Sequence, residues 1–336
     1  MHNEIILSIC IPTYNRSKLL TEALDSILVS VAGFEDKVEI IVSDNASYDD
    51  TIDVVKKYQS KHNLIRYNRN TENVIDKNFF IAASLARGKY IWIFADDDKM
   101  EEQAVTNVLN FINQNYNLII CNYSIWNNDF TVKLKERFFN ISKNIEFNNH
   151  NVILKKLGNK LQFLSSIVIE KNTFFNLDEE EYNSLHEYGI SFAFSLYCGI
   201  LKKAKAVLIA EPQLRYRGYN SDIVEKDKWY KYFATGTSLL FEGLRKKGYS
   251  NSAIYSAKNI ALKTYIIHDI SYRKRTGENL NGIFKLILPY YKYQILFWIM
   301  IVPMIISPKF ILVFVNKIVV VLRNLKKLMF VKSFET

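Results

Sequence analysis

The sequence contains little glycine, proline or cysteine, and each shortage excludes a class of protein. Glycine occupies 11 of 336 positions and proline 5, which excludes a collagen-like repeat and a linker-rich chain. Cys10, Cys121 and Cys198 are far apart, so they form neither a CxxC zinc pattern nor a dense disulfide scaffold. The amino-terminal apolar run follows no basic stretch and precedes no small-residue cleavage site. We therefore expect a cytoplasmic chain without a signal peptide.

The loop after the first apolar run also lacks glycine. No glycine precedes Gly33, so this loop can be neither a GxGxxG dinucleotide loop nor a GxxxxGK[ST] phosphate loop. Rossmann dehydrogenases and P-loop NTPases are excluded on this ground.

Short apolar runs alternate with longer amphipathic segments along the first 123 residues. The expected strands cover residues 5–11, 38–42, 64–67, 90–94 and 118–121, and the expected helices cover 18–31, 50–61, 74–86 and 101–114. This alternation predicts an α/β fold with a mostly parallel sheet that is covered by helices on both faces. Ligands of such sheets bind outside the carboxyl ends of the strands, where the polar clusters 12–16, 43–50 and 96–98 fall.

The remaining chain is less regular. A strand is expected at residues 163–169, and helices are expected at 189–201, 227–247 and 252–275. After these helices the composition becomes apolar and basic.

The carboxyl-terminal segment 282–336 carries most of the chain's net charge of +10. It holds eight basic residues and one acidic residue, so it contributes +7. Its apolar runs are interrupted by Pro303, Pro308 and Lys309, which disfavours a single membrane-spanning helix. We expect a helical pair lying on the inner face of the membrane, attracted by anionic lipids. The alternative is a helical pair packed on the rest of the chain or on a second subunit. Nucleic-acid binding is not expected, because exposed aromatic residues do not alternate with the basic ones.

Three consecutive carboxylates, Asp96, Asp97 and Asp98, directly follow the apolar run 90–94. Like charges at this spacing repel, so a shared cation best explains them. Oxygen ligands favour Mg²⁺ or Mn²⁺, which keep water and phosphate oxygens as their other ligands. The alternative is that these residues form an acidic cap for the helix expected near Glu101.

The sequence around these aspartates resembles the family 2 glycosyltransferases. The matching segments are Pro12-Thr13-Tyr14-Asn15-Arg16, then Ser43-Asp44-Asn45-Ala46-Ser47-Tyr48-Asp49-Asp50, then Gly88-Lys89-Tyr90 and the aspartates. The resemblance covers residues 5 to about 115 and weakens after Cys121. It implies a GT-A fold and an inverting, metal-dependent transfer of sugar from a nucleotide sugar.

The resemblance also implies roles for individual residues. It places the donor nucleotide against Pro12, Thr13, Tyr14, Asn15 and Arg16, against Asp44 and Asn45, and against Lys77 and Asn78. Within these groups Thr13 and Tyr14 would line the base pocket, and Asp44 would accept a hydrogen bond from the base. Asp96 would contact the ribose or the sugar, and Asp97 or Asp98 would hold Mn²⁺ or Mg²⁺. The aspartate run begins one position late relative to Gly88, so the choice between Asp97 and Asp98 stays open.

A general base is expected in the second half of the chain, because the aspartates are occupied by metal and donor. The resemblance places it at Glu187, while the run 178–181 is interpreted as a solvated acidic surface. The segment Gln213-Leu214-Arg215-Tyr216-Arg217 differs from the QxxRW motif of processive relatives. A single-sugar transfer is therefore expected.

The predicted organisation has three parts. Residues 1–220 form the catalytic domain, with a nucleotide-binding half up to about residue 123 and an acceptor half at 124–220. Residues 221–281 form a helical segment, and 282–336 form the basic tail. The expected donor is a UDP-sugar, and the expected acceptor is a hydroxyl of a surface polysaccharide, a lipopolysaccharide or a lipid-linked glycan. The alternatives are a sugar nucleotidyltransferase, disfavoured by the missing Gly-rich loop, and a non-catalytic membrane-binding protein; self-association stays open.

Overall fold

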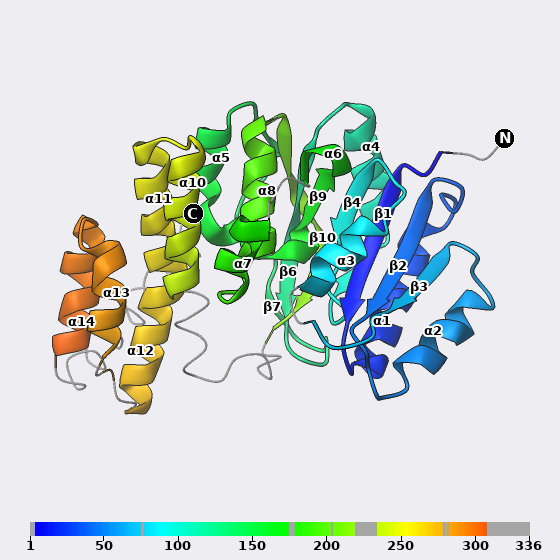
Figure 1. The fold of residues 1–336 in the computed structure, drawn as a ribbon, viewed down its shortest axis with the longest axis horizontal. Coiled ribbons are helices and arrows are strands. Elements are labelled where there is room, and N and C mark those ends of the chain that lie inside the picture. The colour runs from blue at the N-terminus through cyan, green and yellow to red at the C-terminus, as the bar shows by residue number, and fades with distance from the viewer. Residues whose placement is uncertain are drawn as a thin grey trace, which may run out of the picture.

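The structure, a computed structural model, describes residues 4–307 apart from 75–76, 175–178, 203, 219–233, 278–279 and 281. Its centre is one ten-stranded sheet with the order β3-β2-β1-β4-β9-β6-β10-β5, in which β7 pairs with β6 and β8 with β10 (Figure 1). The strands are β1 (Leu7–Thr13), β2 (Val38–Asp44), β3 (Ile65–Arg69), β4 (Tyr90–Ile93), β5 (Lys99–Met100), β6 (Leu118–Trp126), β7 (Lys133–Lys135), β8 (Ile145–Phe147), β9 (Ile167–Glu170) and β10 (Ala206–Arg217).

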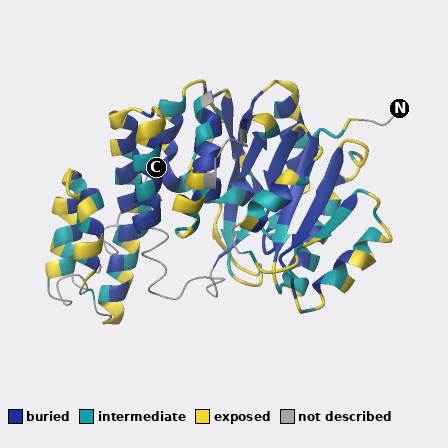
Figure 2. Cartoon of the chain, in the orientation of Figure 1, coloured by how far each residue is buried: buried dark blue, intermediate teal, exposed yellow. Residues whose placement is uncertain are grey.

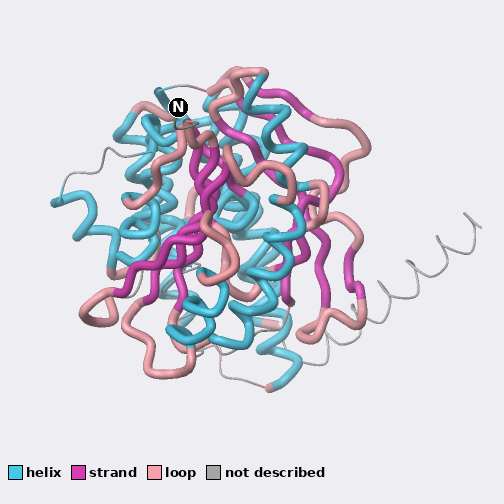
Figure 3. Tube along the Cα trace, turned by 90° about the vertical axis from the view of Figure 1, so that its right-hand side faces the viewer, coloured by secondary structure: helices cyan, strands magenta, loops and turns pink. Residues whose placement is uncertain are grey.

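Six of these strands run in the same direction, so the prediction of a mostly parallel sheet is confirmed. Strands β3, β2, β1 and β4 pair in parallel, and β6 pairs in parallel with β10. Strand β9 lies between β4 and β6 and is antiparallel to both, so β6 runs in the same direction as β4. Figure 3 shows the sheet as a twisted surface surrounded by helices.

Helices cover both faces of the sheet, as predicted. The helices are α1 (Ser17–Val31), α2 (Thr51–Gln59), α3 (Lys77–Ser84), α4 (Ala104–Asn113), α5 (His150–Leu157), α6 (Lys171–Phe174), α7 (Glu179–His186), α8 (Ser191–Lys202), α10 (Thr237–Lys247), α11 (Asn251–Ala261), α12 (Ile267–Thr276), α13 (Ile283–Tyr291) and α14 (Val302–Ile306). Helix α1 packs against α2 and α4, while α3 packs against β1, β2 and β4 from the opposite face. This arrangement follows from the right-handed crossovers between parallel strands.

All strands and helices predicted before residue 123 are present. All seven residues of β2 are buried, as expected of a central strand that is covered on both faces. The second half was predicted less completely. The strand expected at 163–169 begins only at Ile167, after a short 3₁₀ turn over Leu164–Ser166. The long strand β10 was not predicted, because Pro212 and shifts in its pairing register break its apolar pattern.

Two apolar cores divide the described chain. The larger core lies on both faces of the sheet and extends through α10 and α11 to Ala261. The smaller core joins Leu262, Ile266 and Ile270 to side chains of the carboxyl-terminal helices. The larger core thus contains residues on both sides of position 220, and the predicted domain division there stays a prediction.

The described part of the basic tail folds back onto α12. Ile283, Ile287, Tyr291, Phe297 and Ile301 are buried in the smaller core. Figure 2 shows exposed residues along the outer side of this helical end, whereas the central strands β1, β2 and β4 are almost entirely buried. Among the described residues, no helix combines the length and apolar content that a membrane crossing requires. Residues 308–336 lie outside the described residues, so the interface expected for them stays a prediction.

A buried carboxylate ties three strands together at the end of the sheet where β1 and β2 begin. Glu39 is 4% exposed and accepts hydrogen bonds from Ser8 Oγ at 2.6 Å, Arg87 N at 2.6 Å and Arg66 Nη1 at 2.8 Å. Ser8 Oγ also accepts from Gly88 N at 2.8 Å, and a Cβ at Gly88 would lie 2.8 Å from Ser8 N. Position 88 therefore requires glycine, because the backbone of β1 at Ser8 lies too close for any side chain.

We predict that Glu39→Gln destabilises the fold at pH 7 by roughly 1.5–3 kcal/mol, the range for hydrogen bonds to a charged group. Burial raises the pKa of Glu39, but the bonds from Ser8, Arg87 and Arg66 outweigh it and hold the pKa below its ordinary 4.5. A lowered pKa stabilises the fold above pH 4.5, and this contribution is lost as the pH falls through the folded-state pKa. Urea unfolding at pH 7 and at pH 3.5 should therefore show a smaller difference between the two proteins at acidic pH. A difference that is independent of pH would contradict this role.

Candidate active site

A cavity of about 440 Å³ opens at the carboxyl ends of β1, β2 and β4, within the size range of small-molecule sites. It is lined by Pro12, Thr13, Tyr14, Arg16, Asn45, Asn73, Asn78, Phe79, Ala95, Asp96 and Asp97. Eight of the predicted site residues are in this lining. The other predicted residues, Asn15, Asp44, Lys77, Asp98 and Glu187, are not.

The loop after β1 contacts the aspartate run directly. Thr13 Oγ1 donates to Asp96 Oδ2 at 2.7 Å. Arg16 Nη1 donates to Asp96 Oδ1 at 3.0 Å and to Asp97 Oδ2 at 3.2 Å, so one guanidinium bridges two carboxylates. Burial raises the pKa of Asp96 to about 6, and the charge of Asp97 adds to this shift, while Arg16 opposes it. The positive charge of Arg16 thus offsets only part of the charge of Asp96 and Asp97. The remaining negative charge is costly to bury.

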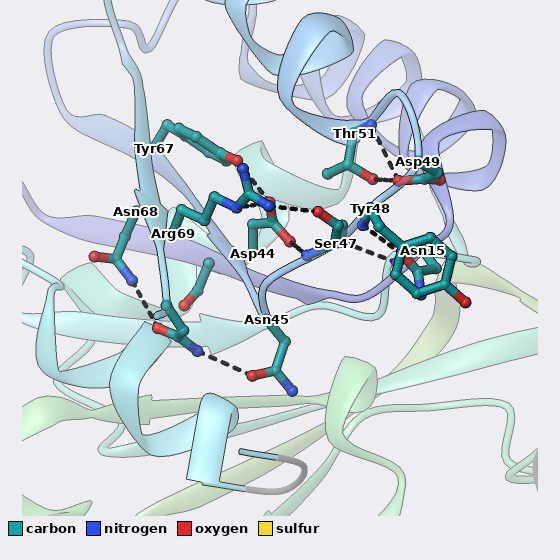
Figure 4. Close-up of polar contacts among 12 residues, drawn as sticks. Asn15, Asp44, Asn45, Ser47, Tyr48, Asp49, Thr51, Tyr67, Asn68 and Arg69 are labelled. Carbon is teal, nitrogen blue, oxygen red and sulfur yellow. Dashed lines mark hydrogen bonds and ion pairs between the residues drawn. The ribbon is translucent and has the colours of Figure 1, made fainter. Parts of the chain in front are cut away.

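Asp44, the last residue of β2, is fully buried and outside the cavity lining. Figure 4 shows its polar contacts. Its Oδ1 accepts from Ser47 N at 2.8 Å, and its Oδ2 accepts from the Tyr67 hydroxyl at 2.6 Å and lies 3.8 Å from Arg69 Nε. Burial and the hydrogen bond to Asp44 raise the pKa of Tyr67, so the phenol stays a donor. Asp44 therefore shapes the loop after β2 in this structure. The predicted contact with a base stays a prediction, since a carboxylate can accept further hydrogen bonds.

Asn15 joins the loops after β1 and β2. Its backbone has a φ of 52°, a left-handed conformation that asparagine tolerates better than most residues. The Asn15 amide N donates to Ser47 Oγ at 2.9 Å, and Oδ1 accepts from Tyr48 N at 2.8 Å (Figure 4). Asp49 extends this connection, because its carboxylate accepts from Ser17 N, in the first turn of α1, at 2.9 Å. These contacts explain why Asn15 and Asp49, residue types that are common in turns, occupy the loops after β1 and β2.

An amide network that was not predicted from the sequence orders the segment between β3 and α3. Asn70 Nδ2 donates to Asn45 Oδ1 at 3.1 Å and to Asn78 Oδ1 at 2.9 Å, and Asn45 Nδ2 donates to Asn73 Oδ1 at 2.7 Å. Asn78 is buried. Its Oδ1 also accepts a hydrogen bond from the Ser43 hydroxyl, and its Nδ2 donates to the Ser43 carbonyl. Lys77, at the start of α3, is exposed and outside the cavity lining. A clustering of asparagines at 68, 70 and 73 is the only sequence signal for this network.

The third aspartate turns away from the cavity toward a buried arginine that was not predicted as a site residue. Arg217 is 4% exposed and lies at the end of β10. Its backbone N donates to Asp98 Oδ1 at 3.1 Å, and its Nε donates to the Asp97 carbonyl at 2.8 Å. Its Nη2 binds Glu22 Oε2 at 2.9 Å, and Nη1 contacts the Asn128 carbonyl. Arg217 thereby fixes the backbone that presents Asp97 and Asp98.

The chemistry of Asp97 and Asp98 fits a divalent cation. Asp98 is 1% exposed, and its Oδ2 has no hydrogen-bond partner among the described residues. Burial raises the pKa of Asp98 well above its ordinary value, and the charge of Asp97 adds to it, while the nearby Ser165 hydroxyl opposes the shift. The described residues include no cluster of three acidic, histidine or cysteine ligands. A cation here would therefore take one or two carboxylates and complete its shell with water or phosphate oxygens.

Glu187 is exposed in the turn between α7 and α8, just after α7 ends. Aromatic contacts attach these helices to α3, whose Phe79 lines the cavity. The Phe80 ring lies 5.3 Å from Tyr182 and 5.2 Å from Phe192, and Phe79 lies 5.9 Å from Phe192 between centroids. The turn of Glu187 is thus held beside the helix that forms one wall of the cavity, although Glu187 itself does not line it.

The chain is similar in sequence to known bacterial sugar transferases. The chain is 28% identical over 185 residues to the abequosyltransferase RfbV of Salmonella typhimurium, an alignment covering 52% of this chain and 55% of that protein. It is 27% identical over 254 residues to the GalNAc(5)-diNAcBac-PP-undecaprenol beta-1,3-glucosyltransferase of Campylobacter jejuni, covering 67% and 78% of the two chains. The chain thus spans about half the length of the first relative and more of the second.

The fold resembles solved structures as well. Residues 1–349 of Staphylococcus aureus TarS, in complex with UDP, superpose with a TM-score of 0.57 at 14% identity, covering 81% of this chain and 78% of that one. This likeness supports the GT-A fold expected from the sequence. The sequence profile of glycosyl transferase family 2 matches residues 8–178, which include the cavity residues and the aspartate run. The chain therefore belongs to glycosyl transferase family 2.

Proposed function

We propose that this protein transfers one sugar from a nucleoside diphosphate sugar to a hydroxyl of a bacterial surface glycan or its lipid-linked precursor. The observation that carries the proposal is the cavity in which Arg16 and the aspartates meet at the carboxyl ends of β1 and β4. Both relatives are named as sugar transferases, and the name of the second, a GalNAc(5)-diNAcBac-PP-undecaprenol glucosyltransferase, supports a lipid-linked acceptor. The UDP in the TarS complex supports uracil as the base of the donor.

The donor would occupy the cavity with its nucleotide toward Thr13 and Tyr14. Tyr14 is partly exposed and meets Tyr48 edge to face, with 6.2 Å between ring centroids, so one ring face is held at the cavity rim. Asn45 and Asn78, which belong to the same lining, would bind further donor groups, and Asp96 would accept from a ribose or sugar hydroxyl. Arg16 would contribute positive charge to the diphosphate, since an arginine fork matches phosphate oxygens.

Asp97 and Asp98 would hold Mn²⁺ or Mg²⁺ with the diphosphate. A metal held there would supply positive charge against the charge that develops on the leaving diphosphate. Arg217 would keep both carboxylates in place through its contacts with the Asp97 carbonyl and Asp98 Oδ1. Its ion pair with Glu22, at 2.9 Å, is a further contact that holds the guanidinium in position.

The reaction would be a single displacement at the anomeric carbon. The acceptor oxygen bonds to that carbon as the bond to the diphosphate oxygen breaks, which inverts the configuration. A carboxylate takes the proton of the acceptor hydroxyl, and Glu187 is proposed for this role. The helices that flank its turn pack against α3, which contributes Asn78 and Phe79 to the cavity lining.

The proposal predicts that UDP binds at least tenfold more tightly in Mn²⁺ than in EDTA. Isothermal titration calorimetry of the full chain tests this, because a cation shared by carboxylates and diphosphate couples the two ligands. GDP should bind more weakly than UDP under the same conditions. Equal affinity for UDP with and without metal would contradict a metal-bridged donor site, and preference for GDP would reassign the base.

A further inference from the structure

A second cavity, of about 560 Å³, lies in the helical part of the chain and shares no lining residue with the donor cavity. It is formed by α10, α11 and the segment that follows Pro289 of α13. Arg245, Lys258 and Lys292 contribute three cations to its lining, and Glu242 contributes one carboxylate. The titratable side chains of this cavity therefore carry an excess of positive charge.

The single carboxylate is shared by two of the cations. Lys258 is 5% exposed, and its Nζ lies 2.5 Å from Glu242 Oε1 and 3.0 Å from the Tyr290 carbonyl. Arg245 Nη1 lies 3.1 Å from the other oxygen of Glu242. A buried ammonium and a guanidinium that share one carboxylate favour a further anion.

A lining residue of the cavity also carries a buried hydrogen-bond acceptor. Gln294 lines it and is 3% exposed, and its Oε1 has no hydrogen-bond partner among the described residues. A buried carbonyl oxygen without a donor is costly, so a ligand that carries a hydroxyl group would satisfy it. Cations beside an acceptor match a ligand with a phosphate and a neighbouring hydroxyl.

Exposed apolar side chains continue from the cavity edge. Tyr293 lines the cavity and is 78% exposed, and it is followed by Ile295, Trp298 and Ile299, at 66%, 48% and 66%. These four residues are called the apolar rim here. Trp298 Nε1 donates to the Lys292 carbonyl at 2.7 Å, and Lys292 Nζ lies 5.1 Å from the Tyr293 ring centroid. The cationic cavity and the apolar rim therefore adjoin through Tyr293, which belongs to both, and through the contact of Trp298 with Lys292.

We propose that this surface is a membrane-docking site, in which the cavity binds the headgroup of an anionic phospholipid and the apolar rim enters the bilayer interface. Phosphatidylglycerol has the required chemistry, a phosphate next to hydroxyl groups. Tryptophan, tyrosine and lysine beside aliphatic residues are the composition of interfacial anchors. This inference rests on the proposed function, because a docking site of this kind would bring the enzyme to lipid-linked acceptors at the membrane.

The test uses the full chain and sedimentation with vesicles of phosphatidylcholine, with and without one third phosphatidylglycerol. The variant Arg245→Gln/Lys292→Gln removes two cavity charges. The control Lys246→Gln/Lys285→Gln removes two exposed charges from the same helical region, outside the cavity lining. We expect the cavity variant to lose at least about tenfold more partitioning into the anionic vesicles than the control. Equal losses would indicate diffuse attraction to the surface and would overturn the headgroup site.

A second measurement separates a lipid from other occupants. Short-chain phosphatidylglycerol below its micellar concentration should change the tryptophan fluorescence of the wild type and not that of the Trp298→Phe variant. An equal response to inorganic phosphate would assign the cavity to free phosphate and overturn the proposal.

Ile295→Asn/Ile299→Asn should weaken vesicle binding. If it instead dissociates a dimer, the rim binds a second copy. UDP affinity in Mn²⁺ should be unchanged in every variant, so failure here leaves the proposed transfer reaction untouched.

Discussion

Asp98→Asn is expected to lower kcat of sugar transfer by roughly 10³-fold or more, since stabilisation of the leaving diphosphate is worth several kcal/mol. The loss should occur without unfolding. Asp98 is a buried carboxylate whose pKa is raised by burial and by Asp97, so its charged form is disfavoured in the fold. An asparagine can still accept from Arg217 N through its carbonyl oxygen. The melting temperature of the variant should therefore equal or exceed that of the wild type.

The matched control is Asp53→Asn, the same change at an exposed position of α2. It should retain full activity. Asp97→Asn should also lose activity, because it removes the negative charge of a proposed metal ligand that also pairs with Arg16. Initial rates measured at saturating donor and Mn²⁺ check all three. If both Asp97→Asn and Asp98→Asn retain activity, the proposed metal site is in the wrong place.

Glu187→Gln is expected to lower kcat by roughly 10²-fold or more while leaving donor affinity nearly unchanged. Glutamine keeps the size of the side chain and removes its basicity, and general bases contribute about 10²–10⁴-fold. Because the residue lies outside the donor cavity, UDP binding in Mn²⁺ should stay the same. A fall in kcat and kcat/KM together would indicate an interaction made only in the transition state.

The control for this variant is Glu180→Gln, on the exposed surface of the neighbouring helix α7. It should turn over normally. If Glu187→Gln is active while Asp178→Asn or Glu181→Gln is inactive, the base lies in the acidic run instead. The class of reaction would survive that outcome, because it depends on the donor cavity.

The amino-terminal half was predictable because its signals are local. Strands such as β2 are continuously apolar, and helices such as α1 repeat apolar residues at helical spacing, so chain order alone predicts alternating strands and helices. The polar clusters at the strand ends then converge, because parallel strands end at one edge of the sheet. Eight of the predicted residues line the resulting cavity.

The second half was less predictable because its signals are not local. Strand β10 contains Pro212 and a bulge, and its pairing with β6 is made over about ninety residues of sequence separation. In the sequence Arg217 is only part of a segment that differs from the QxxRW motif, yet the fold buries it against the Asp97 carbonyl and Glu22. No periodic pattern marks such a residue, because its partners come from three different elements.

The sequence by itself determined the α/β class, the strand-end position of the site and the family, since these depend on local hydrophobic period and on motifs within one segment. Tertiary structure decided how the site residues are used. It turned Asp44 into a buried support for its loop, set Arg16 between two carboxylates and joined Lys258 and Lys292 in one cavity. Burial and charge pairing depend on which side chains meet across the fold, and that is a property of packing rather than of any local pattern.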